Sequence, residues 1–277
     1  MIKYSVIIPT YNDTERTVKL VNTIKEIIPK KVDVEIIIAD NNPDLQVEFI
    51  NIDDVRVIHC IEAGSYNARN KAILEAEGDL LIFTDSDCIP DENWISNIDK
   101  VVNRCGFDVI AGKTKIFRGN STELAYLYER NIAFNFDNMK GNKVATTSNL
   151  IVKRSLMNNN LFNTISFSGG DVEWTSKYSL NKDIYYDEEI VVFHPSRESI
   201  TNILEKDERV YGGFLKRKNK LKLFFSNLLP PITQIKLTLK SNEIISDKIK
   251  LLLVVFFLRY IRIYLHLKIS FSGVYRR

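Results

Sequence analysis

Two aspartates, Asp85 and Asp87, flank Ser86 directly after the apolar run at residues 80–83. A short apolar run that is closed by turn-forming residues predicts a buried strand, so both carboxylates stand at a strand's carboxyl end. Open α/β sheets bind their ligands at that edge. Two close carboxylates need a cation or hydrogen-bond donors, and hard oxygen ligands suit Mg²⁺ or Mn²⁺. Taken alone the pair is a weak signal, because a solvated turn can have the same composition.

Other polar side chains follow the neighbouring predicted elements. The first strand runs into Pro9, Thr10 and Tyr11, where the Tyr11 ring could face a planar ligand. Asp40 ends the second strand at the same edge and could accept a hydrogen bond from a base or ribose, or it could cap a helix. Arg69 lies one turn into a helix, and its guanidinium matches diphosphate oxygens, although a surface ion pair is the alternative.

The elements that must position these side chains alternate between strands and helices. Strands are predicted at residues 5–8, 34–39, 55–58, 80–84, 109–117 and 145–153, and helices at 13–28, 66–76 and near 121–136. This alternation predicts an α/β fold with an open, mostly parallel sheet and helices on both faces. The character changes near Leu221, and we expect a catalytic domain at 1–215 and a basic, apolar helical appendage at 216–277.

Composition limits the class of protein. The chain has 277 residues, of which 45% are hydrophobic and 26% charged, so it can bury a large core and is not disordered. A net charge of +3 is too small to indicate nucleic acid as a partner. Cys60, Cys88 and Cys105 form no close pair, which is typical of a reducing compartment and excludes a structural zinc motif. Residues 1–9 are predicted to be a strand, not a targeting segment.

Taken in chain order, these motifs resemble a family 2 glycosyltransferase with the GT-A fold. The matching residues are 6–12 (VIIPTYN), 37–41 (IIADN), Gly64 with 68–70 (ARN), 78–87 (GDLLIFTDSD) and 169–174 (GGDVEW). The resemblance implies transfer of a sugar from a nucleotide-linked donor, commonly with uracil, to an acceptor hydroxyl with inversion. It implies that Tyr11 and Asp40 hold the base, that Arg69 and Asp85 hold the nucleotide further in, and that Asp87 binds Mn²⁺ or Mg²⁺. Pro9, Thr10 and Ser86 are expected to take part in binding the nucleotide.

Asp171 matches the general base of this family. An acceptor hydroxyl is a weak nucleophile, and a carboxylate within hydrogen-bond reach can take its proton as it attacks. The family often has an acidic residue before this aspartate, whereas this chain has Gly170; Glu173 could partly replace it or contact the acceptor. Asp171 could also cap the helix that follows. His194 follows a predicted strand, and its imidazole could complete the metal site with Asp87 or cap a carbonyl group instead.

The C-terminal region combines basic and apolar residues. Its basic run consists of Arg209, Lys216, Arg217, Lys218, Lys220 and Lys222. The apolar stretch at 249–267 is interrupted by Lys250, Arg259, Arg262 and His266, which argues against a membrane-spanning helix. The pattern is typical of a helix that lies in a membrane surface, and it predicts a cytoplasmic enzyme at the inner face of the cell membrane. A helical pair that packs on the catalytic domain or forms a homo-oligomer is the alternative.

The leading hypothesis is an enzyme of polysaccharide, capsule or related glycan synthesis, whose acceptor is a glycan or a lipid-linked sugar. A polyprenyl-phosphate sugar synthase is the near alternative. A sugar nucleotidyltransferase would carry a glycine-rich phosphate loop after its first strand, and residues 10–13 (TYND) contain no glycine. A non-catalytic nucleotide-sugar sensor or scaffold is a third hypothesis, against which the intact Asp85, Asp87 and Asp171 argue.

Overall fold

The computed structural model describes residues 3–46, 49, 52–165, 168–217 and 220–272. Contacts within the chain divide it into two compact units. The sheet unit comprises Met1–Lys115, Phe136–Thr164 and Gly170–His194, and the helical unit comprises Ile116–Asn135, Ile165–Gly169 and Pro195–Arg277.

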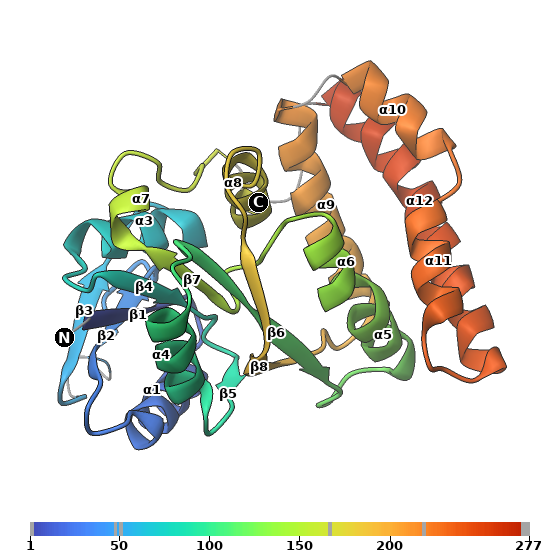
Figure 1. Ribbon diagram of the computed structural model, residues 1–277. Helices are drawn as coiled ribbons and strands as arrows, with labels where there is room; N and C mark the ends of the chain where they lie inside the picture. The colour runs from blue at the N-terminus through green and yellow to red at the C-terminus, as the bar shows by residue number, and fades with distance from the viewer. Residues whose placement is uncertain (1–2, 47–48, 50–51, 166–167, 218–219, 273–277) are drawn as a thin grey trace. The chain divides into compact units, whose positions relative to one another are not determined.

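A mixed sheet forms the centre of the sheet unit (Figure 1). Its strands are β1 (Lys3–Thr10), β2 (Asp33–Asp40), β3 (Val55–His59), β4 (Leu80–Phe83), β5 (Ile89–Pro90), β6 (Val109–Phe117), β7 (Leu150–Lys153) and β8 (Tyr185–Pro195). They lie in the order β3-β2-β1-β4-β7-β6-β8-β5. The first four strands in this order are parallel, whereas β7 is antiparallel to β4, β6 to β7, and β5 to β8.

Helices cover both faces of this sheet, because successive side chains of a buried strand point to opposite faces. In β1, Val6 and Ile8 pack into one core cluster and Ile7 into the other. The first cluster contains residues of α1 (Thr14–Ile27) and α4 (Trp94–Arg104), and the second contains residues of α3 (Ser65–Glu75), α7 (Arg154–Met157) and α8 (Gly170–Tyr178). The predicted α/β fold class is therefore confirmed.

One predicted strand is shorter than expected. The sequence predicted a strand over 145–153, but β7 begins at Leu150. The preceding residues use their polar groups elsewhere: the backbone N–H of Thr147 donates to Asp171, and the side chain of Asn149 bonds Lys113, Ile190 and Trp94. Apolar periodicity could not show that these backbone and side-chain groups serve a neighbouring element.

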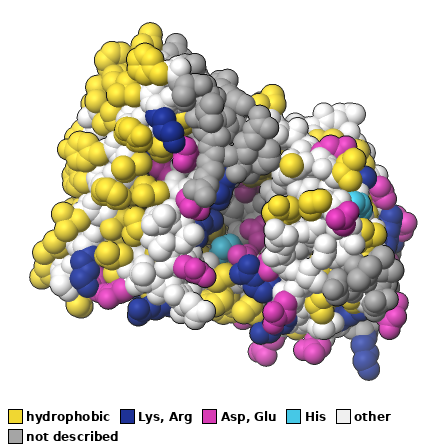
Figure 2. Space-filling model, turned by 180° about the vertical axis from the view of Figure 1, so that it is seen from behind, with side chains coloured by type: hydrophobic (Ala, Val, Ile, Leu, Met, Phe, Trp, Pro, Cys, Tyr) yellow, Lys and Arg dark blue, Asp and Glu magenta, His cyan; other side chains and the backbone are white. Residues whose placement is uncertain are grey.

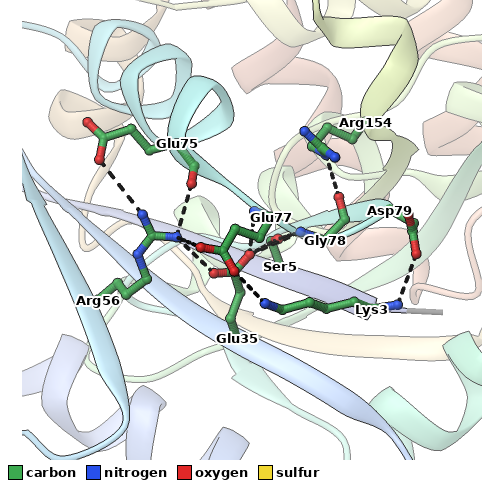
Figure 3. A network of polar contacts seen from close by, with 9 residues as sticks. All are labelled: Lys3, Ser5, Glu35, Arg56, Glu75, Glu77, Gly78, Asp79 and Arg154. Atoms are coloured by element: carbon green, nitrogen blue, oxygen red, sulfur yellow. Dashed lines mark hydrogen bonds and ion pairs between the residues drawn. The ribbon is translucent and has the colours of Figure 1, made fainter. Parts of the chain in front are cut away.

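A polar network closes the turn between α3 and β4 (Figure 3). The Glu35 carboxylate accepts hydrogen bonds from the Ser5 hydroxyl at 2.5 Å, the backbone N–H groups of Glu77 and Gly78 at 2.6 and 3.1 Å, and Arg56 at 3.1 Å. A Cβ at Gly78 would lie 2.5 Å from the Ser5 oxygen, so only glycine fits there. Burial alone would raise the pKa of Glu35, but the bonds from Ser5, the backbone and Arg56 lower it below its ordinary value. The network thus fixes the starting point of β4 relative to α3.

The helical unit contains α5 (Glu123–Tyr128), a π-helical turn η1 (Glu129–Ala133), α9 (Ile200–Arg217), α10 (Lys220–Leu228), α11 (Ile232–Lys240) and α12 (Ile245–Ser272). The long α12 packs against α5, α9, α10 and α11. Its buried residues Val254 and Leu258 join Ala125 and Ile203, and Leu265 and Ile269 join Tyr211 and Leu215. The predicted C-terminal helices are confirmed. Within the described part of the chain, no helix is both long and apolar enough to cross a membrane.

Candidate active site

The carboxyl ends of the parallel strands meet at one sheet edge. Thr10 pairs with Asp40 across β1 and β2, and Ile7 pairs with Phe83 across β1 and β4. Because β4 ends at Phe83, the residues that follow it, Asp85 to Asp87, leave the sheet at the edge where β1 and β2 also end. The structure therefore brings these strand ends together as the alternating pattern predicted.

Asp85, Asp87 and His194 form a cluster at this edge, with one ligand atom of each within 4.8 Å of the others. The pairing of β5 with β8, in which Ile89 lies opposite Phe193, brings His194 beside the acidic turn. The His194 Nε2 atom lies 3.5 Å from an Asp87 carboxylate oxygen. Burial raises the pKa of Asp87, and Asp85 raises it further while His194 opposes the rise. Two carboxylates in one partly buried place are unfavourable unless a positive charge neutralises them.

This donor set fits a divalent cation. Carboxylate oxygens and an imidazole nitrogen suit Mn²⁺, and carboxylates suit Mg²⁺. The fit concerns the types of ligand atom and their proximity. The sequence had predicted Asp87 and His194 as the metal ligands and Asp85 as a residue that holds the nucleotide.

Arg69 joins the same cluster from α3. Its guanidinium is buried, forms an ion pair with the Asp85 carboxylate, and lies 5.5 Å from the centre of the Tyr66 ring. The Arg69 Nε atom is buried and has no hydrogen-bond partner among the described residues. A buried donor without a partner costs about 1–3 kcal/mol, so this side chain is prepared for an added acceptor such as a phosphate oxygen.

Asp171, at the start of α8, is 8% exposed and accepts hydrogen bonds on both oxygens. Its Oδ1 accepts from the Tyr66 hydroxyl and from the backbone N–H of Val172, each at 2.8 Å. Its Oδ2 accepts from the backbone N–H of Thr147 at 2.9 Å and from the Thr147 hydroxyl at 3.3 Å. The Thr147 hydroxyl makes the longest of these contacts and is the one that an incoming hydroxyl could most readily replace.

Tyr66 connects the two parts of the site. Its hydroxyl bonds Asp171, and its ring lies beside the Arg69 guanidinium that pairs with Asp85. A Cβ at Gly170 would approach the Tyr66 ring to 3.0 Å, so the ring occupies the space that a side chain before Asp171 would need. This contact gives a physical reason for glycine where the resemblance led us to expect an acidic residue. Burial, and then the charge of Asp171, raise the pKa of Tyr66 well above its ordinary value.

The other predicted site residues are not part of the contacts described above. Tyr11 is 59% exposed, whereas Asp40 is fully buried and accepts hydrogen bonds from Asn42 and from the backbone of Gln46. The Asp40 carboxylate therefore organises the loop after β2 in this structure. Pro9 and Thr10 are buried at the end of β1, and the Thr17 hydroxyl donates to Thr10. Ser86 donates to Asp13 at 2.6 Å. Glu173 bonds Lys177 at 2.8 Å, one helical turn away.

Tyr66 and Thr147 were not predicted as site residues. Tyr66 stands three residues before Arg69, and this spacing places both side chains on one face of a helix. The sequence therefore contained a signal for Tyr66. It contained no signal for Thr147, because the contact of Thr147 with Asp171 joins residues 24 positions apart.

Comparison with known proteins identifies the family. The sequence profile described as "Glycosyl transferase family 2" matches residues 5–182. The chain belongs to glycosyl transferase family 2. It is 29% identical over 228 residues to glycosyltransferase AglE of Haloferax volcanii, a match that covers 76% of this chain and 72% of the relative. It is 27% identical over 126 residues to poly(ribitol-phosphate) β-N-acetylglucosaminyltransferase TarS of Staphylococcus aureus, covering 43% of this chain and 22% of TarS.

Solved structures show the same fold. The crystal structure of S. aureus TarS 1–349 in complex with UDP-GlcNAc superposes with a TM-score of 0.58 and 20% identity, over 94% of this chain and 73% of that one. TarS 1–349 in complex with UDP superposes with a TM-score of 0.55 and 18% identity, over 100% of this chain and 93% of that one. The family and the GT-A fold predicted from the sequence are thus confirmed, and so is the prediction that the protein is a glycosyltransferase enzyme.

Proposed function

We propose that the protein is an inverting glycosyltransferase that moves a sugar from a UDP-linked donor to an acceptor hydroxyl, with a divalent metal at Asp85, Asp87 and His194 and with Asp171 as the general base. The observation that carries this proposal is the continuous set of contacts from the acidic cluster through Arg69 and Tyr66 to Asp171. It joins groups suited to a diphosphate with a carboxylate suited to an acceptor.

The donor half of the site supports a nucleotide diphosphate. A bound Mn²⁺ or Mg²⁺ would supply positive charge to the diphosphate oxygens. Arg69 would bind the same oxygens through its unsatisfied Nε, since guanidinium donors match phosphate geometry. Tyr11, which is exposed beside this edge, would stack on the base, and uracil is supported by the UDP and UDP-GlcNAc bound to TarS. Pro9, Thr10, Asp40 and Ser86 would shape the base and ribose site.

The acceptor half supports a single displacement. Asp171 would accept a hydrogen bond from the acceptor hydroxyl in place of the Thr147 hydroxyl, and would take the proton as the oxygen attacks the anomeric carbon. The new carbon–oxygen bond forms as the bond to the diphosphate breaks, and the diphosphate leaves with its electron pair. Arg69 then stabilises the charge of the leaving group. One attack from the side opposite the leaving group inverts the anomeric configuration.

The setting we propose is polysaccharide or glycan synthesis on a glycan or lipid-linked acceptor, at the inner face of the cell membrane. The name of one relative, poly(ribitol-phosphate) β-N-acetylglucosaminyltransferase, supports a polymeric acceptor, and the name of the other, a glycosyltransferase, supports the type of reaction. Exposed apolar side chains on the C-terminal helices support a membrane contact. The catalytic domain would extend to about residue 215, with the appendage at 216–277 as the membrane-binding part.

Asp171→Asn tests the proposal. The amide keeps the size of the side chain but cannot take a proton, so transfer should fall by about 10²- to 10⁴-fold while UDP binding stays within a factor of about two. Radiolabelled transfer from a panel of UDP-sugars and calorimetry with UDP and Mn²⁺ measure the two quantities. Transfer at the wild-type rate would show that Asp171 only caps α8. A product that keeps the donor's anomeric configuration would refute the single displacement.

A further inference from the structure

Exposed apolar side chains gather on the last three helices. Among the described residues, 24 large hydrophobic side chains are exposed, and 16 of them lie between Leu221 and Phe271. Figure 2 shows the resulting field of hydrophobic side chains on the side of the molecule that α10 to α12 form. Soluble monomers seldom expose contiguous apolar patches of this kind unless the patch binds something. We therefore expect this patch to bind a partner or a surface.

The patch is most regular along α12. Its outer stripe consists of Ile249, Leu253, Phe257, Tyr260, Tyr264, Leu267 and Phe271, each at least 45% exposed. Their spacing of three or four residues places them on one face of the helix. The opposite face is also apolar, but it is buried: Val254 and Leu258 pack with α5 and α9, and Leu265 and Ile269 pack with α9. The fold of the helical unit thus uses one face of α12 and leaves the other exposed.

The cations that interrupt the apolar sequence of α12 lie off the outer stripe. Arg262 makes two hydrogen bonds with Asp207 of α9, at 2.7 and 2.8 Å. Arg259 donates to the carbonyl group of Ser226, which lies within α10, and to that of Leu229, which follows it. Lys250 pairs with Glu123 and Asp247, and His266 bonds Tyr211. These partners hold the polar groups toward α5, α9 and α10, so the outer stripe carries no charge.

Charge indicates which occupant fits. Residues 216–277 contain 14 Lys and Arg but only two acidic residues, a net charge of +12, whereas residues 1–215 carry a net charge of −9. The side chains of residues 216–220, and with them Lys216, Arg217, Lys218 and Lys220 of the predicted basic run, lie outside the described part. Lys222, Lys236 and Lys240 are described and exposed on α10 and α11. A second copy docked on this patch would bring two regions of +12 together, which is unfavourable. An anionic lipid surface offers both apolar chains and the opposite charge.

We infer that the outer stripe of α12, with the exposed apolar side chains of α10 and α11, inserts into the interfacial layer of a bilayer that contains anionic lipid. The inference rests on the membrane part of the proposed function and deepens it by naming the inserting surface and the lipid class. Phe and Tyr side chains on the stripe suit this depth, because their rings combine apolar bodies with polar edges or hydroxyls. The lysines bind lipid headgroups and are screened by salt, whereas the inserted apolar side chains are not.

Flotation of the full-length protein with vesicles tests the inference. We expect binding to phosphatidylcholine vesicles with 30% phosphatidylglycerol, weaker binding without the anionic lipid, and binding that falls but persists at high salt. Leu253→Ser/Leu267→Ser should lower the partition coefficient about tenfold or more, because two inserted side chains are lost. The matched control is Leu74→Ser/Leu180→Ser, which removes two leucines that are 65% and 80% exposed in the sheet unit and should leave partitioning unchanged.

Three results would overturn the inference. The first is that wild-type protein does not bind anionic vesicles, and the second is that both double variants lose binding equally. The third is a dimer in sedimentation equilibrium that Leu253→Ser/Leu267→Ser dissociates, since the stripe would then bind another copy. Transfer of sugar to a soluble acceptor is measured separately without vesicles. A protein that binds vesicles but transfers no sugar would contradict the proposed reaction and leave the lipid-binding surface standing.

Discussion

Removing one hydroxyl group, in Tyr66→Phe, separates the role of Tyr66 in positioning Asp171 from its role beside Arg69. The substitution deletes the 2.8 Å hydrogen bond to the Asp171 carboxylate but keeps the ring that contacts the Arg69 guanidinium. It also leaves the space against Gly170 filled. Donor binding and base positioning should therefore respond differently to the same variant.

The size of the effect follows from the type of bond. A hydrogen bond to a charged group is worth about 1.5–3 kcal/mol. If that bond holds Asp171 in its productive orientation, its loss should lower kcat by about 10- to 100-fold, since each 1.36 kcal/mol is tenfold in rate. The Michaelis constant for the donor should change by less than about twofold.

Tyr4→Phe is a matched control. Tyr4 is also buried, and its hydroxyl also donates to an aspartate, Asp99, at 2.8 Å, but this pair lies on the opposite face of the sheet. Both variants should lose similar free energy of unfolding in urea titrations. Steady-state kinetics should show a lower kcat, with little change in the Michaelis constant for the donor, for Tyr66→Phe only. Equal kinetics in the two variants would mean that Tyr66 is structural and that the other hydrogen bonds of Asp171, from Val172 and Thr147, are enough to orient it.

Two further predictions concern the metal cluster and the network around Glu35. Asp87→Asn should raise the UDP dissociation constant in Mn²⁺ at least about tenfold and leave binding without metal unchanged. The control variant Asp91→Asn should keep both values. Calorimetry that shows Mn²⁺-independent binding in the wild type would contradict the metal assignment. Ser5→Ala should lower the free energy of unfolding at pH 7 by about 1.5–3 kcal/mol, because it removes a bond to an ionised carboxylate. The folded-state pKa of Glu35 lies below its ordinary 4.5, so this stabilisation is present above pH 4.5 and is lost as the pH falls through the folded value; urea titrations that show the same difference at low pH would contradict the link to Glu35.

Much of the sheet unit could be predicted from the sequence because its signals are local. Apolar runs, turn residues and helical spacing located β1 to β4, α1 and α3 to within a few residues. Parallel strands then place their carboxyl ends at one edge by geometry, so the proximity of Asp85 and Asp87 to the end of β1 followed from the alternation alone. His194 was the one member of the candidate metal cluster that came from far along the chain. The sequence placed it after a strand, whereas it lies within β8, one residue before that strand ends.

Contacts between distant segments could not be predicted in the same way. The bond between Tyr66 and Asp171 joins residues 105 positions apart, and the pair of Arg262 with Asp207 joins residues 55 apart. In the sequence alone, Arg259 and Arg262 interrupt an apolar stretch. In the structure they bond α9 and the end of α10 instead of lying on the exposed apolar face. The burial of Asp40 likewise depends on the loop that folds over it, which periodicity does not describe.

The contacts around Gly170 explain why an apparent departure from the family pattern is consistent with activity. An acidic side chain at this position would add a second charge near Asp171, but here the space is filled by the Tyr66 ring. The same ring donates its hydroxyl to Asp171 and contacts Arg69, which pairs with Asp85. A neutral donor thus stands where a carboxylate would repel Asp171. The Tyr66 ring also contacts Arg69, the arginine of the proposed diphosphate site. A shift of Arg69 on binding of the nucleotide sugar would therefore move Tyr66 and, through its hydroxyl, the proposed base Asp171.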